Sequence, residues 1–298
     1  MTAPGTTALL RAGDRTLELS QRVAVMAIVN RTPDSFYDRG ATFALEAAIA
    51  AGRRAVDAGA DIVDVGGVKF APGPPVPVEE EVARVVPVVR ELAGDVAVSV
   101  DTFQPAVARA AIEAGAAVIN DTTGLADPDM ARVVADSDAA VVIAHSLAAP
   151  RTKLPVPRYD DVVADVSAWL RDRRERALEA GVPADRIILD PGHDLNKNTL
   201  HSLELTRRIG DVAALGSPLL VALSNKDFIG ETLGRDRSAR LAGSLAAAVY
   251  CVQQGARIVR VHNVAETVDA MRMLEAILGW RVPPDDALVH NMRPEGNA

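Results

Sequence analysis

The sequence predicts an α/β protein made of a single (β/α)8 TIM barrel. Its 298 residues are close to the roughly 250 typical of this fold. Hydrophobic residues make up 49% of the chain and aromatic residues only 3%, so Ala, Val, Ile and Leu must fill the core between helices and strands. Eight apolar runs stop at polar residues, and runs this continuous are typical of parallel strands buried on both faces.

The predicted strands follow from these apolar runs. In three of them a helical segment first stops at a glycine, namely Gly59, Gly115 and Gly255. A glycine there can take the left-handed conformation that closes a helix, so each marks a junction from helix to strand. The segments that carry the eight strands are 23–30, 57–67, 96–101, 113–121, 139–146, 186–192, 218–224 and 253–263.

Amphipathic stretches between the runs are long enough to serve as crossover helices. These stretches are residues 44–58, 79–93, 104–114, 161–180, 237–254 and 265–278. No linker divides the chain, so we expect one barrel over residues 23–280. Residues 1–22 are predicted to form an N-terminal extension. Residues 281–298, rich in Pro, Gly and Asn, are predicted to form a C-terminal tail.

Composition argues against several kinds of partner. The net charge is −8 and no run of Lys and Arg occurs, so neither nucleic acid nor an anionic membrane is expected to bind. The single cysteine, Cys251, cannot form an internal disulfide and is expected to be a buried apolar residue, which suits a reducing cytoplasm. No apolar run approaches about 18 residues and no signal peptide is recognisable, so we expect an unexported protein without a membrane span.

Polar residues at the strand ends predict the position of the active site. In a (β/α)8 barrel the site forms at the carboxyl ends of the strands. An unpaired polar group inside an apolar run costs roughly 1–3 kcal/mol, so convergence on a central pocket explains these residues better than separate loops do. They are Asn30, Asp64, Asp101, Asn120, Asp121, His145, Asp190, Ser224, Asn225, Lys226, Arg260 and His262.

The residue types at the strand ends suggest a chemistry. Carboxylates, an amide and a lysine can hydrogen-bond a flat heterocycle that carries donors and acceptors on its edge. Asn30, Arg260 and His262 lie on the first and last strands, which are neighbours in a closed barrel. Together they can hold a phosphate group or its magnesium ion. The sequence therefore predicts a heterocycle site beside an anion site.

Several of these polar residues also have a structural interpretation. Asp64 lies two residues before the end of its strand, and fits a hydrogen-bond acceptor for neighbouring loops as well as a site residue. His145 is more typical of a core histidine than of a catalyst. His193 and His201 lack the i, i+4 spacing of a metal pair, which argues against zinc.

In its motifs the chain resembles dihydropteroate synthase, the folate-pathway enzyme that sulfonamides inhibit. The resemblance covers roughly residues 23–280 and runs in order through all eight predicted strands. Its matching segments are MAIVNRTPDSFYDRG, DVGG, SVDT, AGAAVIND, AHS, LDPGHDLNKN, LSNKDFIGETLG and RVHNV.

The resemblance implies transfer of a dihydropterin-CH2 group from its diphosphate to the amine of p-aminobenzoate, with Mg²⁺ and loss of pyrophosphate. It also implies a homodimer formed through the last helices, and a lid over the site from the loop after the first strand. By motif, the implied pterin-binding residues are Asp101, Asn120, Asp190, Lys226 and Arg260. The implied diphosphate-binding residues are Asn30, Arg260 and His262, with Asn30 also at the metal.

The chain departs from the family at the wall expected to bind the second substrate. It reads GGVKFAPG where the family usually reads GGESTRPG, so that Phe70 and Ala71 replace a threonine and an arginine, and Lys69 supplies a cation nearby. It reads SNKD in place of SRKS, which puts Asp227 where a hydroxyl is expected, and its charge would repel the carboxylate of p-aminobenzoate. It reads DPGHDLNKN in place of DPGFGFGKN, which puts Leu195 where a phenylalanine flanks the ring.

Three functions are compatible with this combination of matches and departures. The first is a dihydropteroate synthase-like transferase whose p-aminobenzoate wall is altered. The second is a divergent paralogue, like the second homologue that some actinobacteria carry, which binds a pterin with little or no synthase turnover. The third is a barrel transferase that uses another nucleophile. Fold alone does not choose among them, because function belongs to the site.

Overall fold

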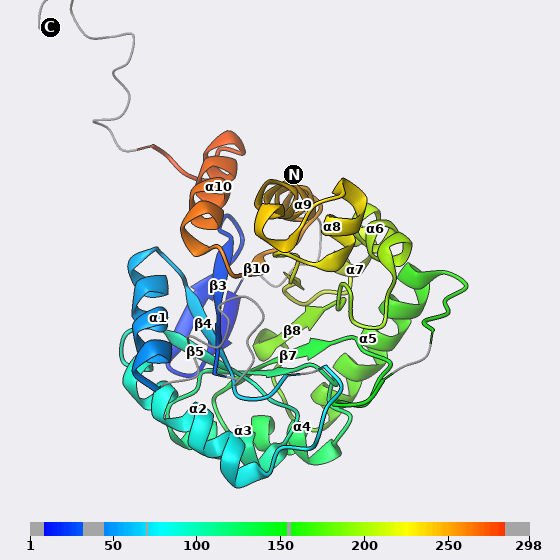
Figure 1. Ribbon diagram of the computed structural model, residues 1–298. Helices are drawn as coiled ribbons and strands as arrows, with labels where there is room; N and C mark the ends of the chain where they lie inside the picture. Colours follow the sequence, from blue (N-terminus) through cyan, green and yellow to red (C-terminus); the bar gives the residue numbers. More distant parts are fainter. Residues whose placement is uncertain (1–8, 32–44, 70, 154–155, 284–298) are drawn as a thin grey trace, which may run out of the picture.

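A computed structural model describes residues 9–31, 45–69, 71–153 and 156–283. Its main element is an eight-stranded parallel sheet in the order β8-β7-β6-β5-β4-β3-β10-β9. A parallel bridge between Leu189 and Leu219 joins the two ends, so the sheet forms a nearly closed barrel (Figure 1). The strands are β3 (Ala24–Asn30), β4 (Ile62–Gly66), β5 (Ala97–Asp101), β6 (Val118–Asp121), β7 (Ala140–Ala144), β8 (Ile187–Asp190), β9 (Leu220–Val221) and β10 (Ile258–Val261). The predicted fold class is confirmed.

Helices surround the barrel and lie between successive strands (Figure 1). The predicted crossover segments form α1 (Leu45–Asp57), α2 (Val78–Leu92), α3 (Pro105–Glu113), α5 (Val162–Glu179), α9 (Leu241–Gln253) and α10 (Val264–Ile277). Shorter helices that the sequence did not predict are α4 (Pro128–Ala135), α6 (Thr199–Arg207), α7 (Ile209–Ala213) and α8 (Asp227–Leu233). Few turns give a weak helical period, which explains why these were missed.

The glycines predicted at the junctions from helix to strand are confirmed. The φ angles of Gly59, Gly115 and Gly255 are 93°, 107° and 116°. Each glycine lies two residues beyond the end of its helix and closes it in a conformation that costs other residues energy. The predicted burial of Cys251 on α9 is also confirmed, and burial raises the pKa of its thiol to about 12.

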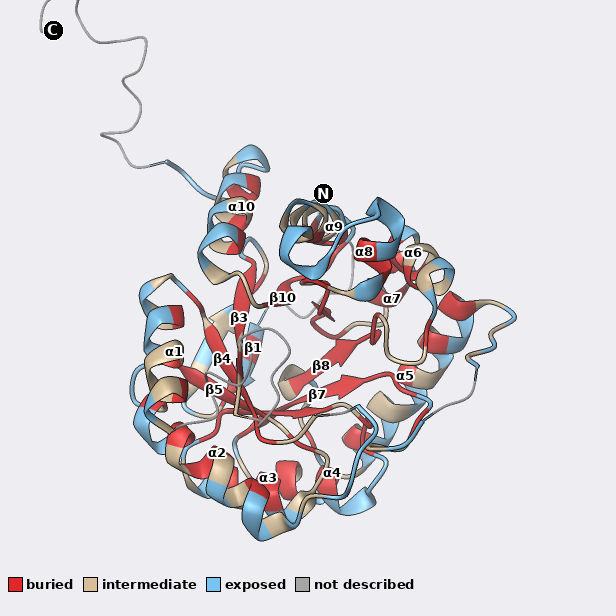
Figure 2. Cartoon of the chain, in the orientation of Figure 1, coloured by how far each residue is buried: buried red, intermediate tan, exposed pale blue. Residues whose placement is uncertain are grey.

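Alternate residues of each strand serve two different cores. On β3, Val25, Ala27 and Val29 pack into the layer between strands and helices. Ala24 and Met26, on the opposite face, belong to a separate cluster inside the barrel. This two-residue period is the reason why the strands read as continuous apolar runs. Figure 2 shows the buried residues concentrated on the strands and on the inner faces of the helices.

The predicted N-terminal extension contains a β-hairpin of β1 (Leu9–Ala12) and β2 (Arg15–Glu18). Leu10, Ala12 and the following Leu19 are buried with Met26 and Ile62 in the cluster inside the barrel. The hairpin therefore completes the interior core at the amino-terminal end of the strands, opposite the end where a barrel places its active site. Within the described ranges, no helix is both long and apolar enough to cross a membrane.

Candidate active site at the carboxyl end of the barrel

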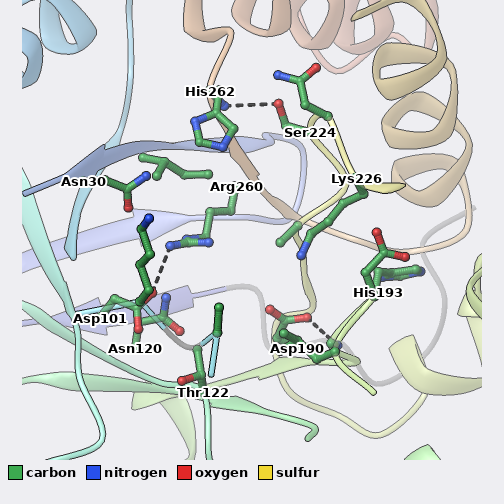
Figure 3. Close-up of a pocket in the computed structure, with 18 of the residues that line it drawn as sticks. Asn30, Asp101, Asn120, Thr122, Asp190, His193, Ser224, Lys226, Arg260 and His262 are labelled. Carbon is green, nitrogen blue, oxygen red and sulfur yellow. Dashed lines mark hydrogen bonds and ion pairs between the residues drawn. The ribbon is translucent and has the colours of Figure 1, made fainter. Parts of the chain in front are cut away.

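The carboxyl ends of the strands surround a cavity of about 350 Å³. Figure 3 shows side chains from several strands turned into it. Phe70, predicted for the second-substrate wall, lies outside the described residues. Every other residue to which the resemblance gives a role or a place in the second-substrate wall lines the cavity, namely Asn30, Lys69, Asp101, Asn120, Asp190, Leu195, Lys226, Asp227, Arg260 and His262. The barrel thus brings together residues that are up to 232 positions apart in the chain, from Asn30 to His262, whereas their individual roles stay predictions.

Three polar residues near the strand ends do not line the cavity. Asp121 holds the loop after β6, since its carboxylate accepts hydrogen bonds from the backbone amides of Thr123 and Leu125 at 2.8 and 2.9 Å. His145 is buried, and Lys197 Nζ lies 2.9 Å from its Nδ1. The interpretation of His145 as a satisfied core histidine is confirmed. The third residue, Asp64, lies beneath the cavity floor.

A buried ion-pair network forms one side of the floor. Arg260 on β10 lies between two carboxylates, with its Nε 2.6 Å from Asp64 Oδ2 and its Nη2 3.1 Å from Asp101 Oδ2. Burial raises the pKa of Asp101 to about 7, although the Arg260 guanidinium opposes the shift. A carboxylate poised near neutral pH can gain or lose a proton when a ligand binds.

Asp190 and Lys226 form the other side of the floor. Asp190 ends β8 and accepts a hydrogen bond of 2.7 Å from the backbone amide of Gly192. Burial raises the pKa of this carboxyl and lowers the pKa of the Lys226 ammonium, while each group partly offsets the shift of the other. Figure 3 shows Lys226 extending into the cavity toward Asp190. The floor therefore offers an acceptor and a donor side by side to the edge of a heterocycle.

The loop from β8 to α6 holds residues that sequence reasoning missed. Asp194 lines the cavity, and its Oδ2 accepts hydrogen bonds from the backbone amides of Asp227 and Phe228 at 2.6 and 3.3 Å. It therefore caps α8 from a different loop. Asp194 and Asn196 both have left-handed backbones, with φ of 61° and 53°. Asp and Asn are among the residues that tolerate this conformation best, so their presence in the loop could have indicated its left-handed turns from the sequence.

Lys197 fastens the same loop from behind the cavity. Its ammonium donates to the backbone carbonyls of Gly192 and Leu195 at 2.9 and 3.1 Å. Burial lowers the pKa of Lys197 to about 7 and that of neighbouring His145 to about 3. Neutral His145 can accept the lysine hydrogen at Nδ1, so the backbone that carries Leu195 is held by a saturated set of bonds.

His193 lies in this loop as a neutral, buried ring. Burial lowers its pKa to about 3, and the ring stacks on Phe228 with centroids 5.9 Å apart. Its Nε2 lies 3.2 Å from the hydroxyl of Thr206, which itself donates to the carbonyl of Ser202. Nε2 must therefore carry the ring hydrogen.

Within the described part of the chain, no group of three or more His, Cys, Asp and Glu side chains is placed to hold a metal ion.

Asp227 has a partner that the sequence did not reveal. Its Oδ1 lies 2.8 Å from Nη1 of Arg240 and 4.0 Å from Nη2 of Arg237, and 68% of its side chain is exposed. The sequence predicts that the Asp227 charge repels the carboxylate of p-aminobenzoate. Two guanidiniums and solvent screen this charge, so the repulsion is weaker than expected. Arg237 also lines the cavity and was not predicted there.

Arg151 positions the altered loop that carries Lys69. From the loop after β7 it donates to the backbone carbonyls of Lys69 and Ala71 at 2.9 and 2.6 Å, and to that of Pro74 at 3.2 Å. A guanidinium that serves three carbonyls fixes a loop that has little secondary structure of its own. Lys69 therefore lines the cavity from a backbone position that Arg151 holds in place.

The predicted anion side lies across the join between the first and last barrel strands. Residues of β10 pair in parallel with β3, with Arg260 opposite Met26, so Asn30 and His262 approach the same rim of the cavity. The backbone amide of His262 donates to Ser224 Oγ at 3.2 Å, which ties this rim to the loop after β9. Figure 3 shows the side chains of Asn30 and His262 on the side of the cavity where Arg260 lies.

Fold and site together define a (β/α)8 barrel with a pocket lined by charged and polar side chains at the carboxyl ends of its strands. Comparison with known proteins gives the family. Residues 26–262 match the family described as pterin binding enzyme. The chain belongs to this family, and its relatives make it dihydropteroate synthase-like.

The relatives include proteins with two different names. The chain is 48% identical over 276 residues to the "Inactive dihydropteroate synthase 2" of Mycobacterium leprae, which covers 89% of this chain and 94% of that one. It is 42% identical over 257 residues to the "Dihydropteroate synthase" of Escherichia coli K12, which covers 85% and 91%. The solved dihydropteroate synthase of Xanthomonas albilineans with 4-aminobenzoic acid superposes with a TM-score of 0.85 at 42% identity, over 93% of this chain and all of that one.

Proposed function

We propose that this protein is a dihydropteroate synthase-like transferase that binds a dihydropterin methyl diphosphate and uses p-aminobenzoate poorly. One observation carries the proposal. Asp101, Asn120, Asp190, Lys226 and Arg260 all line a single cavity at the carboxyl end of the barrel. The solved relatives include one from Burkholderia cenocepacia complexed with 7,8-dihydropteroate, which supports a pterin as the ligand of this floor.

The reaction requires charge stabilisation that these side chains are able to supply. The amine nitrogen attacks the pterin methylene carbon, the carbon–oxygen bond to the diphosphate breaks, and the amine loses a proton as pyrophosphate leaves. Asp101 and Asp190 stabilise the positive charge that develops on the pterin. Arg260 and His262 bind the leaving diphosphate, although Arg260 shares its charge with two carboxylates.

Magnesium is proposed as the ion that accompanies the diphosphate. Mg²⁺ is usually held by one or two protein oxygens, with phosphate oxygens and water completing its shell. Asn30 supplies such an amide oxygen at the end of β3 and lines the cavity, so the donor set fits this ion. When bound, Mg²⁺ would offset negative charge on the diphosphate.

The second-substrate wall is the reason for proposing poor use of p-aminobenzoate. Lys69, Leu195 and Asp227 line the cavity in place of the residues usual in the family, and Asp194 adds a further carboxylate to this wall. A second candidate function is pterin binding without synthase turnover. The 48% identity to a protein named an inactive synthase favours it.

A homodimer and a cytoplasmic location complete the proposal. Two large apolar side chains one turn apart on α10, Met273 and Ile277, are 62% and 67% exposed. Such a patch is typical of a protein interface. The single cysteine is buried and is consistent with a reducing compartment. Sedimentation of wild type and Met273→Glu would test the dimer.

Titration and turnover measured on the same preparation test the function. We expect calorimetry to detect binding of the dihydropterin diphosphate with Mg²⁺, and binding to weaken at least tenfold in Asp190→Asn. We expect pyrophosphate release with p-aminobenzoate to be slow beside that of the Escherichia coli enzyme, and the gene to fail to complement a strain lacking dihydropteroate synthase. Absence of pterin binding would refute the proposal. Full complementation would show that the altered wall supports ordinary synthase activity.

A further inference from the structure

Asp64 on β4 is a buried carboxylate that the proposed chemistry does not use. It is 0% exposed and is absent from the residues that line the cavity. Its position in the middle of an apolar strand carries a high desolvation cost, which must be offset by charged or polar partners. Four strands contribute to that arrangement.

The partners of Asp64 come from β5, β6 and β10. Ser99 donates to Oδ1 at 2.6 Å, and the Asn120 amide nitrogen donates to Oδ2 at 3.1 Å. Arg260 Nε donates to the same oxygen at 2.6 Å. Asn120 and Arg260 line the cavity, whereas Asp64 and Ser99 do not. Asp64 is therefore the shared anchor of two residues at the cavity surface.

The contact with Asp64 determines which way the Asn120 amide faces. Only the nitrogen of an amide can donate to a carboxylate, so Nδ2 must be the atom that meets Asp64. The carbonyl oxygen then lies on the other side of the amide as the acceptor available to a ligand. If the amide turned over, its oxygen would face the carboxylate oxygen without a hydrogen, which is repulsive.

The same contact orients Arg260. With Nε engaged by Asp64 and Nη2 by Asp101, one edge of the guanidinium is held by two carboxylates. Figure 3 shows the guanidinium above Asp101 and Asn120 at the side of the cavity. A planar group held at two points keeps its face and its remaining nitrogen in a set direction.

We propose that Asp64 is a positioning residue that orients the Arg260 guanidinium and the Asn120 amide, and so determines the donors and acceptors offered to the ligand. The effect of Asp64 on pterin affinity rests on the proposed function. The effect of Asp64 on the unliganded site does not depend on any ligand, so the two effects can be tested separately.

Asp64 also influences the charge of Asp101 through Arg260. Four charged groups shift the pKa of Asp101: Arg260 on β10, Asp64 on β4, Glu81 on α2 and Asp121 on β6. Burial raises the Asp101 pKa, Arg260 lowers it, and the three carboxylates raise it. Without the Asp64 charge, Asp101 loses a neighbouring negative charge, and Arg260 has Asp101 as its remaining carboxylate partner. Both changes lower the pKa of Asp101.

The test compares Asp64→Asn with Ser99→Ala, which removes a donor to Asp64 but keeps its charge. Carboxyl-labelled NMR of the unliganded proteins follows the titration of Asp101. We expect its pKa to fall toward the ordinary carboxyl value in Asp64→Asn and to remain near the wild-type value in Ser99→Ala. Equal titration in wild type and Asp64→Asn would overturn the proposal, and so would equal shifts in the two variants, which would indicate loosened packing.

Affinity for 6-hydroxymethyl-dihydropterin gives the second readout. We expect at least tenfold weaker binding in Asp64→Asn and about fivefold weaker binding in Ser99→Ala. Because Asp64 acts partly through Arg260, the loss of affinity in Asp64→Asn combined with Arg260→Gln should be smaller than the sum of the two single losses. If the two losses of affinity add in full, Asp64 does not act through Arg260. If Asp64→Asn does not fold, unchanged affinity in Ser99→Ala refutes the proposal. If wild type does not bind the pterin, the proposed function fails while the Asp101 titration still decides the role of Asp64.

Discussion

At the scale of single residues, we expect the pKa of Asp101 to make ligand binding depend on pH. The N–H donors of a pterin need the carboxylate form, whereas burial favours the protonated form with a pKa of about 7. Below that value the ligand must displace a proton, so affinity rises as pH rises. We expect about a tenfold gain between pH 6 and pH 8 in calorimetric titrations with a dihydropterin.

The control for this pH dependence is Asp101→Asn, which has no proton to lose at this position. Its affinity should be weaker than that of wild type and nearly constant between pH 6 and pH 8. Asp190 is the other candidate, since burial raises the pKa of its carboxyl as well. A pH profile that persists in Asp101→Asn would therefore assign the titration to Asp190.

Also at this scale, Asp227→Ser should improve the use of p-aminobenzoate. The substitution removes a carboxylate from the second-substrate wall. Because Arg240 pairs with Asp227 at 2.8 Å and the side chain is largely exposed, the repulsion removed is about 1 kcal/mol. We expect kcat/KM for p-aminobenzoate to rise about threefold to tenfold. Asp269→Ser, on an exposed part of α10, serves as the control. Equal kcat/KM values for wild type, Asp227→Ser and Asp269→Ser would show that the Asp227 charge does not hinder p-aminobenzoate.

At the scale of elements, a buried carboxylate fastens α10 to the first barrel strand. Glu275 is 2% exposed, and its Oε1 accepts hydrogen bonds from the Val23 amide at 2.8 Å and from Arg272 Nη1 at 2.6 Å. Glu275→Ala would leave the Val23 amide and the Arg272 guanidinium without this acceptor. We expect a loss of about 2–4 kcal/mol in the free energy of unfolding.

Denaturant unfolding monitored by circular dichroism measures the effect of Glu275→Ala. The matched control is Asp269→Ala on the same helix, which is exposed and should change the free energy of unfolding by about 0.5 kcal/mol or less. If both variants unfold at the same denaturant concentration, the contact between α10 and the start of β3 contributes little to stability.

At the scale of the whole molecule, the hairpin of β1 and β2 completes the barrel core. Leu10 is 0% exposed and packs in the cluster inside the barrel, while the adjacent Leu9 is 45% exposed. Leu10→Ala should lower the free energy of unfolding by about 2–5 kcal/mol, because it removes apolar contacts and leaves a cavity. Leu9→Ala should change it by less than about 1 kcal/mol. Thermal unfolding of the pair compares opposite faces of one strand, and equal shifts would mean that the hairpin does not close the barrel.

Much of the fold could be predicted because it is encoded in local patterns. Apolar runs mark the strands, and glycines such as Gly59 and Gly255 mark the junctions before them. The short helices were missed because α7 and α8 span only five and seven residues, too few for a clear helical period. For the site, a parallel barrel brings all strand ends to one rim, so strand-end residues such as Asp101 and Asp190 were found without knowledge of their contacts.

The sequence by itself determined the barrel, the positions of its strands and the polar residues at their ends, because these depend on periods of two to four residues along the chain. Only the tertiary structure decided the partners of those residues. Asp64 meets Ser99, Asn120 and Arg260, and Asp227 meets Arg240. Such pairs join segments that are remote in sequence, and their energies depend on burial and distance, which exist only once the strands and helices have packed together.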